Sequence, residues 1–168
     1  MTWVTDAGCA PLLAHNSFID RVVTTAEAPT LVGREFSAVY CLDKSADAQA
    51  ILRLVRAQTV RVLMSDSSTG AIMPASESEA AQNWWRLGWD NQYRFTQQRL
   101  TKLALIHDAL ELGPYTRDPY ILSLTEGEAR EATFRRRSWV QGDGPLVGIN
   151  TGCAGVVPYK KLTVEQHR

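Results

Sequence analysis

The sequence of 168 residues contains little cysteine: Cys9, Cys41 and Cys153 lie far apart, and no two of them form a C-x-x-C pair. A disulfide framework or a structural zinc site needs more cysteines at closer spacing, so the sequence argues against both. The three histidines are equally scattered, which argues against a metal site. We therefore expect a protein of a reducing compartment, the cytoplasm, with no metal and no cofactor.

Long hydrophobic runs are also lacking, and no stretch approaches the roughly 18 apolar residues of a membrane-spanning helix. The first residues carry no basic segment followed by an apolar one, so they do not resemble a secretory signal. An excess of one charge is absent, because 18 Lys and Arg balance 18 Asp and Glu. This balance argues against nucleic acid as a partner. The composition, 45% hydrophobic and 21% charged, is typical of a globular domain.

Short runs typical of β-strands alternate with helical stretches, and this alternation predicts an α/β fold. The order strand, helix, strand over residues 37–64, with short joins, implies a right-handed βαβ crossover. Strands are predicted at 3–5, 21–25, 37–42, 59–64 and 146–150, an extended segment at 119–124, a loop at 65–76, and helices at 6–13, 46–57, 77–87, 95–112, 125–140 and from 163.

A glycine-rich segment, residues 141–145, is the best candidate for a linker between domains. It separates a first domain, residues 1–140, from the start of a second, residues 146–168. The chain begins in a predicted strand and ends three residues into a predicted helix, and one helical turn has almost no stability alone. We therefore expect an internal portion of a longer protein.

The strongest candidate site is the glycine-containing loop within residues 148–161, between a predicted strand and a predicted helix. Glycines let backbone N–H groups face an anion, and a helix N-terminus adds a favourable dipole. Thr151 offers a hydroxyl, and Lys160 or Lys161 a mobile positive charge for a pyrophosphate. The loop matches neither the Walker A pattern nor the dinucleotide fingerprint. The alternative is that the glycines serve only the turn and both lysines are solvated.

Three further features each allow two interpretations. The tryptophans Trp84, Trp85 and Trp89 could stack on sugars or bases, but packing beside a helix is the favoured role. The basic run 135–137 suits the solvated end of a helix, with an anionic membrane or lipid as the alternative. Residues 43–44 follow a predicted strand, where α/β sites gather, and a surface turn explains them equally well.

Two adjacent segments resemble the opening of the C-terminal domain in the heptosyltransferase family, glycosyltransferase family nine. They are VGINTGCAG (147–155) and PYKKLT (158–163). The family's second strand, helix and following turn are similar to residues 2–5, 11–13 and 16–22. Residues 36–44 resemble its segment of a hydrophobic strand followed by Leu-Asp-Lys. Residues 85–112, followed by 119–122, resemble its approach to the second domain. The resemblance covers nearly the whole chain in the right order.

The resemblance implies the GT-B architecture, in which two Rossmann-like domains face each other across a cleft. Such enzymes transfer a heptose or related sugar from a nucleotide-activated donor of the ADP-heptose type to a lipopolysaccharide core or similar lipid-linked glycan. They act at the cytoplasmic face of the inner membrane and need no metal. By residue-level comparison, Asn150, Thr151 and Gly152 lie at the donor phosphates, and Lys160 neutralises the leaving nucleoside diphosphate.

The family's Gly-Asp segment, which carries the proposed general base, belongs upstream of Met1. Half of the family's donor domain belongs beyond Arg168. We therefore assign no catalytic residue within this chain and expect an incomplete GT-B enzyme that has no turnover by itself. Two alternatives stay open: a non-catalytic protein that binds a nucleotide or sugar, and a truncated product without function.

Overall fold

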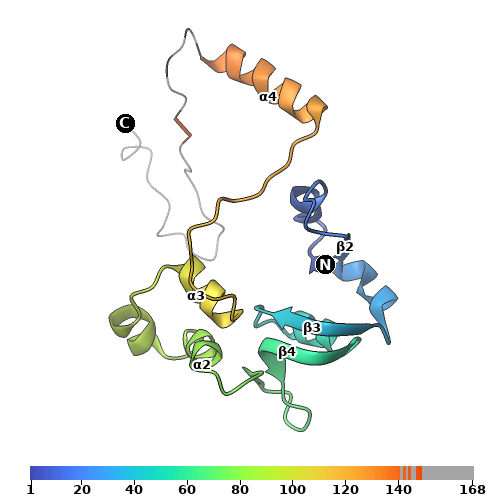
Figure 1. The fold of residues 1–168 in the computed structure, drawn as a ribbon, viewed down its shortest axis with the longest axis vertical. Helices are drawn as coiled ribbons and strands as arrows, with labels where there is room; N and C mark the ends of the chain where they lie inside the picture. Colours follow the sequence, from blue (N-terminus) through green and yellow to red (C-terminus); the bar gives the residue numbers. More distant parts are fainter. Residues whose placement is uncertain (141, 143, 145–146, 149–168) are drawn as a thin grey trace. The chain divides into compact units, whose positions relative to one another are not determined.

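The computed structural model describes residues 1–140, 142, 144 and 147–148. The chain divides into two compact units, Met1–Ser123 and Leu124–Arg168. The first unit is a mixed α/β structure with open sheets, which confirms the predicted fold class at this level (Figure 1). Of the helices and strands among the described residues, all except one α-helix lie in the first unit.

A two-stranded parallel sheet opens the chain. It pairs β1 (Thr2–Thr5) with β2 (Arg21–Thr24), and Trp3 lies opposite Val22. These strands confirm the predictions at 3–5 and 21–25. The predicted helix at 6–13 is instead the short 3-10 helix η1 (Ala10–Leu13), because Asp6 closes a turn on the backbone N–H of Gly8 before it.

The second sheet has the order β3-β4-β5 and contains the predicted strand-helix-strand unit. Strand β3 (Glu35–Cys41) runs parallel to β4 (Arg56–Ser65), and α1 (Ala46–Leu52) connects them (Figure 1). The prediction of a helix to residue 57 was wrong. Arg56 already donates its backbone N–H to Arg34 at 2.8 Å, so strand pairing replaces the helix there.

Strand β5 (Ile72–Pro74) pairs antiparallel with the end of β4, where a loop was predicted. The hairpin turn depends on Asp66, whose carboxylate accepts hydrogen bonds from the backbone and hydroxyl groups of Ser68 and Thr69. These bonds hold the pKa of Asp66 far below its usual range. Gly70, with a φ of +71°, supplies the left-handed residue of the turn.

Two helices follow the hairpin and cover the sheet. Helix α2 (Glu79–Arg86) packs on β4 and β5, and α3 (Lys102–Ala109) packs on α2 (Figure 1). The core of this region consists of buried Val62, Leu63 and Ala109. The prediction of one long helix over residues 95–112 was wrong at both ends, because α3 covers only Lys102–Ala109.

Before α3, the chain forms the π-helical turn η3 (Tyr93–Gln97) and then an extended residue, Gln98. Thr101 then begins α3 by accepting a hydrogen bond from the N–H of Ala104 at 3.3 Å. Beyond α3, residues 119–124 form no strand.

One further 3-10 helix and one further α-helix complete the described chain. The 3-10 helix η2 (Thr25–Leu31) packs on β2, where Val23, Ala28 and Leu31 are buried. In the second unit, α4 (Glu126–Trp139) begins with the predicted capping box of Thr125 and Glu128. The predicted linker at 141–145 and the predicted second domain at 146–168 lie largely outside the described residues, so the domain boundary stays a prediction.

Candidate functional site

The loop residues expected at the donor phosphates lie outside the described residues. They are Asn150, Thr151, Gly152 and Lys160, and their roles stay predictions. The other candidate position, residues 43–44, is described.

Asp43 and Lys44 directly follow β3, at the carboxyl end of the parallel β3–β4 pair. Ligands of open α/β sheets bind outside the carboxyl ends of the strands. The Asp43 carboxylate accepts the backbone N–H of Ser45 at 2.7 Å, and the Ser45 hydroxyl in turn caps α1. The carboxylate of Asp43 therefore shapes the turn that starts the helix.

Lys44 is exposed but its amine has a defined position. Nζ donates a hydrogen bond to the backbone oxygen of Trp84 at 2.8 Å and lies 5.5 Å from the centroid of the same indole. Partial burial of the amine lowers the pKa of Lys44, and the positive charge of Arg94 lowers it further. The sequence interpretation of a plain surface turn therefore misses a contact 40 residues away in the chain.

Gly88 makes room for this amine. A Cβ atom at position 88 would lie 2.9 Å from Nζ of Lys44 and 3.2 Å from the backbone oxygen of Trp85. Both distances are shorter than normal contacts, and the backbone oxygen cannot move as a side chain can. A side chain at position 88 would therefore displace the amine of Lys44 from its present position.

Two tryptophans fix α2 against the sheet, as the favoured packing interpretation expected. The indole N–H of Trp84 donates to the backbone oxygen of Leu42 at 3.2 Å, and that of Trp85 donates to Ile72 at 2.8 Å. Both rings pack against the buried core. Trp89 differs, because it is 60% exposed; its ring meets that of Trp85 in an edge-to-face arrangement, with the centroids 5.2 Å apart.

Gln49 of α1 lies beneath the same strand end and is 3% exposed. Its Nε2 donates to Sγ of Cys41 and to the backbone oxygen of Asp43, each at 3.3 Å. Its Oε1 is buried and accepts no hydrogen bond within the described part of the chain. Burial raises the pKa of the Cys41 thiol, which therefore stays protonated and has a packing role.

The turn after α2 brings further charged and aromatic groups to this region. Arg86 forms an ion pair with Asp90 at 2.7 Å and covers the ring of Tyr93. The N–H of Tyr93, and then Arg86, lower the pKa of Asp90. The guanidinium of Arg94 lies 5.1 Å from the ring centroid of Phe95. Asp90 is thus neutralised locally, while Arg94 has no ion pair with any described residue.

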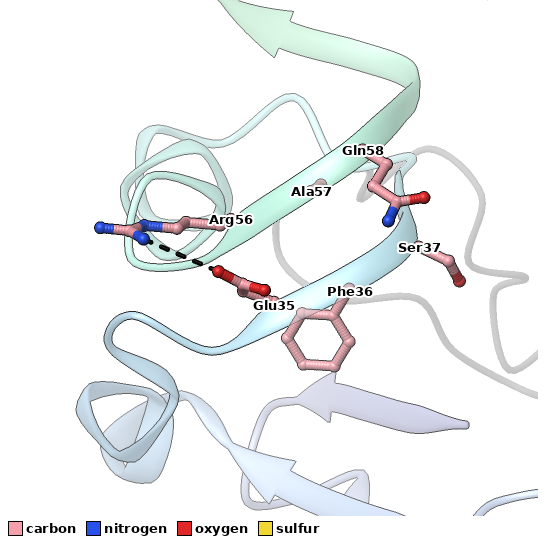
Figure 2. Close-up of a pocket in the computed structure, with 6 residues that line it drawn as sticks. All are labelled: Glu35, Phe36, Ser37, Arg56, Ala57 and Gln58. Carbon is pink, nitrogen blue, oxygen red and sulfur yellow. Dashed lines mark ion pairs between the residues drawn. The ribbon is translucent and has the colours of Figure 1, made fainter.

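A shallow hollow of about 350 Å³ lies at the opposite end of the strands, where β3 and β4 begin (Figure 2). Its lining consists of Glu35, Phe36, Ser37, Arg56, Ala57 and Gln58. Glu35 and Arg56 form an exposed ion pair across the two strands at 3.7 Å. Because ligands of such sheets bind at the carboxyl ends, we do not assign this hollow a function.

The residues that the structure describes contain neither a cluster of metal ligands nor a membrane-spanning helix. Within them, no three His, Cys, Asp or Glu side chains are grouped as metal ligands would be. In the same residues, no helix has the length and apolar character needed to cross a membrane. The end of β3 instead presents the amine of Lys44, held by the backbone oxygen of Trp84 and lying over its indole.

Comparisons with known proteins add no relative. No protein-family model, no curated protein and no solved structure matches this chain.

Proposed function

We propose that this chain belongs to a glycosyltransferase of the heptosyltransferase type. The enzyme would transfer a heptose or related sugar from an ADP-sugar donor to a lipid-linked glycan at the inner membrane. One observation carries the proposal. The parallel β3–α1–β4 unit presents its Leu-Asp-Lys segment at the carboxyl end of the strands, where ligands of open α/β sheets bind. Because one fold hosts many functions, the proposal also depends on the resemblance of four sequence segments.

The proposed chemistry places negative charge at the loop of residues 148–161. An acceptor hydroxyl attacks the anomeric carbon of the donor, the bond between that carbon and the diphosphate oxygen breaks, and the nucleoside diphosphate leaves with the electron pair. Backbone N–H groups at 150–152 and the ammonium of Lys160 would stabilise the leaving diphosphate. The general base that takes the hydroxyl proton is not assigned to a residue of this chain.

Nucleotide binding tests the donor half of this proposal. A protein that also carries the half of the donor domain expected beyond Arg168 should bind ADP in calorimetric titration, and Lys160→Ala is expected to weaken that binding about tenfold, because a hydrogen-bonded charge pair is lost. Lys161→Ala is the matched control, with the same charge removed one residue away, and should bind nearly as well as the parent. In an enzyme that also carries the Gly-Asp segment, Lys160→Ala should lower turnover sharply.

Two results would contradict the proposal. If neither variant changes ADP binding, the loop does not bind the diphosphate through Lys160. If the protein that carries the whole donor domain binds no nucleotide at all, the donor assignment fails. Nucleotide binding that persists without any sugar transfer by an enzyme with the Gly-Asp segment would favour the non-catalytic binding protein.

A further inference from the structure

Helix α3 ends in a turn that brings the chain back beside its last residues. The backbone N–H of Leu112 donates to the oxygen of His107 at 3.2 Å. Glu111 and Gly113 have positive φ angles, 57° and 88°. Left-handed residues after a helix turn the chain back toward the helix end. The turn is also tied to the sheet, because Glu111 forms an ion pair with Arg61 of β4.

The imidazole of His107 contacts the segment that leaves this turn. Its Nδ1 lies 2.9 Å from the backbone oxygen of Gly113, and its ring centroid lies 5.7 Å from that of Tyr115. Tyr115 is half-buried, whereas every other residue from 111 to 123 is exposed. These two contacts, which we call the His107 latch, attach the start of the segment to α3.

The bond to Gly113 depends on a proton. A carbonyl oxygen only accepts hydrogen bonds, so Nδ1 of His107 must carry a hydrogen. The imidazolium always has one there, whereas the neutral ring has it in only one of its two tautomers. The C-terminus of α3 also favours a positive charge, because the helix dipole is negative at this end. Uptake of a proton from solvent therefore strengthens the His107 latch, and its release weakens the latch.

Neighbouring charges are engaged with other partners. Glu111 pairs with Arg61, and Arg86 of α2 pairs with Asp90. Among the residues that the structure describes, no ion pair includes His107. The other titratable or charged groups on α3, on α2 and in the segment near the ring are Lys102, Asp108, Glu79 and Tyr115.

We propose that the His107 latch is a pH-sensitive switch that controls how freely residues 116–123 move. These residues form no helix or strand and lead from the first unit toward α4. A histidine side chain changes its charge between about pH 5 and 8. Because the bond to Gly113 requires the proton on Nδ1, the latch is closed at the lower pH and loosens as the pH rises.

Nuclear magnetic resonance of the ¹³C,¹⁵N-labelled 168-residue chain at pH 5 and pH 8 provides the test. The nuclear Overhauser effect between the ring protons of His107 and Tyr115 measures the closed latch. The ratio of closed to open latch should fall about threefold to tenfold at pH 8, as expected for one weakened hydrogen bond. The ¹³Cα order parameters of residues 116–118 should decrease with it, and the midpoint should coincide with the titration of the His107 ring.

Two substitutions separate the proton from the packing. His107→Asn places an amide N–H near the position of Nδ1 and does not titrate, so its order parameters at 116–118 should be equal at both pH values. His107→Leu has no donor and should be as mobile at pH 5 as the parent is at pH 8. His15→Asn, at an exposed position of the first unit, is the matched control and should keep the pH dependence of the parent.

The ¹⁵N shifts of the imidazole rings supply a second readout. At pH 8, His107 should carry a hydrogen on Nδ1 in a larger share of molecules than His15 does. Three results would overturn the proposal: a parent whose latch and order parameters do not change with pH, a pH dependence that persists in His107→Asn, or equal tautomer populations of His107 and His15. Circular dichroism verifies that each variant is folded, and no nucleotide or sugar is needed, so the outcome is independent of the donor proposal.

Discussion

Val62 has a backbone φ of 76°, although it is a β-branched residue and only 1% exposed. Such a residue in the left-handed region costs about 1–3 kcal/mol. Val62 is the last residue of β4 that pairs with β3, opposite Cys41, and Leu63 is the first that pairs with β5. The strained residue therefore lies at the point along β4 where pairing with β3 ends and pairing with β5 begins. The packing around its buried side chain keeps the valine in this conformation.

In a strand, glycine usually destabilises a protein more than alanine does. The positive φ of Val62 predicts the opposite order of stability at this position. Val62→Ala removes two buried methyl groups, about 1.6 kcal/mol of apolar burial, and keeps the strain. Val62→Gly loses one further buried carbon, about 0.8 kcal/mol, but relieves the strain of about 1–3 kcal/mol. We expect Val62→Gly to unfold at the same urea concentration as Val62→Ala, or a higher one. At Val60, an ordinary position of β4, glycine should be worse than alanine by about 0.5–1 kcal/mol. If glycine were less stable than alanine at position 62 as well as at position 60, the backbone strain at Val62 would be contradicted.

At the scale of elements, α4 shows a helix that depends on its own sequence, because none of its residues is buried. Isolated helices of this length are marginal in water. Its capping box joins Thr125 and Glu128 through the hydroxyl, the carboxylate and both backbone N–H groups. The first turn therefore controls how much of α4 forms.

Thr125→Ala removes the hydroxyl that accepts the N–H of Glu128. We expect a loss of about 1 kcal/mol of helix stability and a clear decrease in the helical ¹³Cα shifts of α4. Thr133→Ala, in the middle of the same helix, is the control and should increase helicity, because alanine has the higher helix propensity. Equal shifts in both variants would show that the cap does not control this helix.

Sequence reasoning located most elements of the first unit, and its failures have physical causes. Strands β1 to β4 were predictable because their residues are apolar and β-branched. Strand β5 was missed because it has three residues and depends on a hairpin turn made by side chains around Asp66. The helix at 95–112 was predicted too long because periodicity does not reveal the extended residue Gln98.

The candidate site was predictable only in part. Its position after β3 follows from strand order, so Lys44 could be named as a candidate. The contact of its amine with Trp84 and the space left by Gly88 are tertiary features that no local pattern reports. The buried amide of Gln49 was missed for the same reason, since glutamine on a helix usually lies in solvent.

At the scale of the whole molecule, the first unit has a core of its own. Val62, Leu63 and Ala109 are buried there, and the two indole hydrogen bonds hold α2 to the sheet. The segment that leaves this unit, residues 114–123, forms no helix or strand, and Tyr120 within it is 85% exposed. The first unit should therefore fold without residues 124–168.

A chain ending at Ser123 tests this independence. Because every core contact named above lies within residues 1–123, we expect its indole N–H signals for Trp84, Trp85 and Trp89 to match those of the 168-residue chain. Thermal unfolding, followed by near-ultraviolet circular dichroism, should occur within a few degrees of the same midpoint, since about 1 kcal/mol shifts it by about 2–8 °C. Collapsed indole dispersion or a lost unfolding transition would show that residues 124–168 supply part of the first unit's stability.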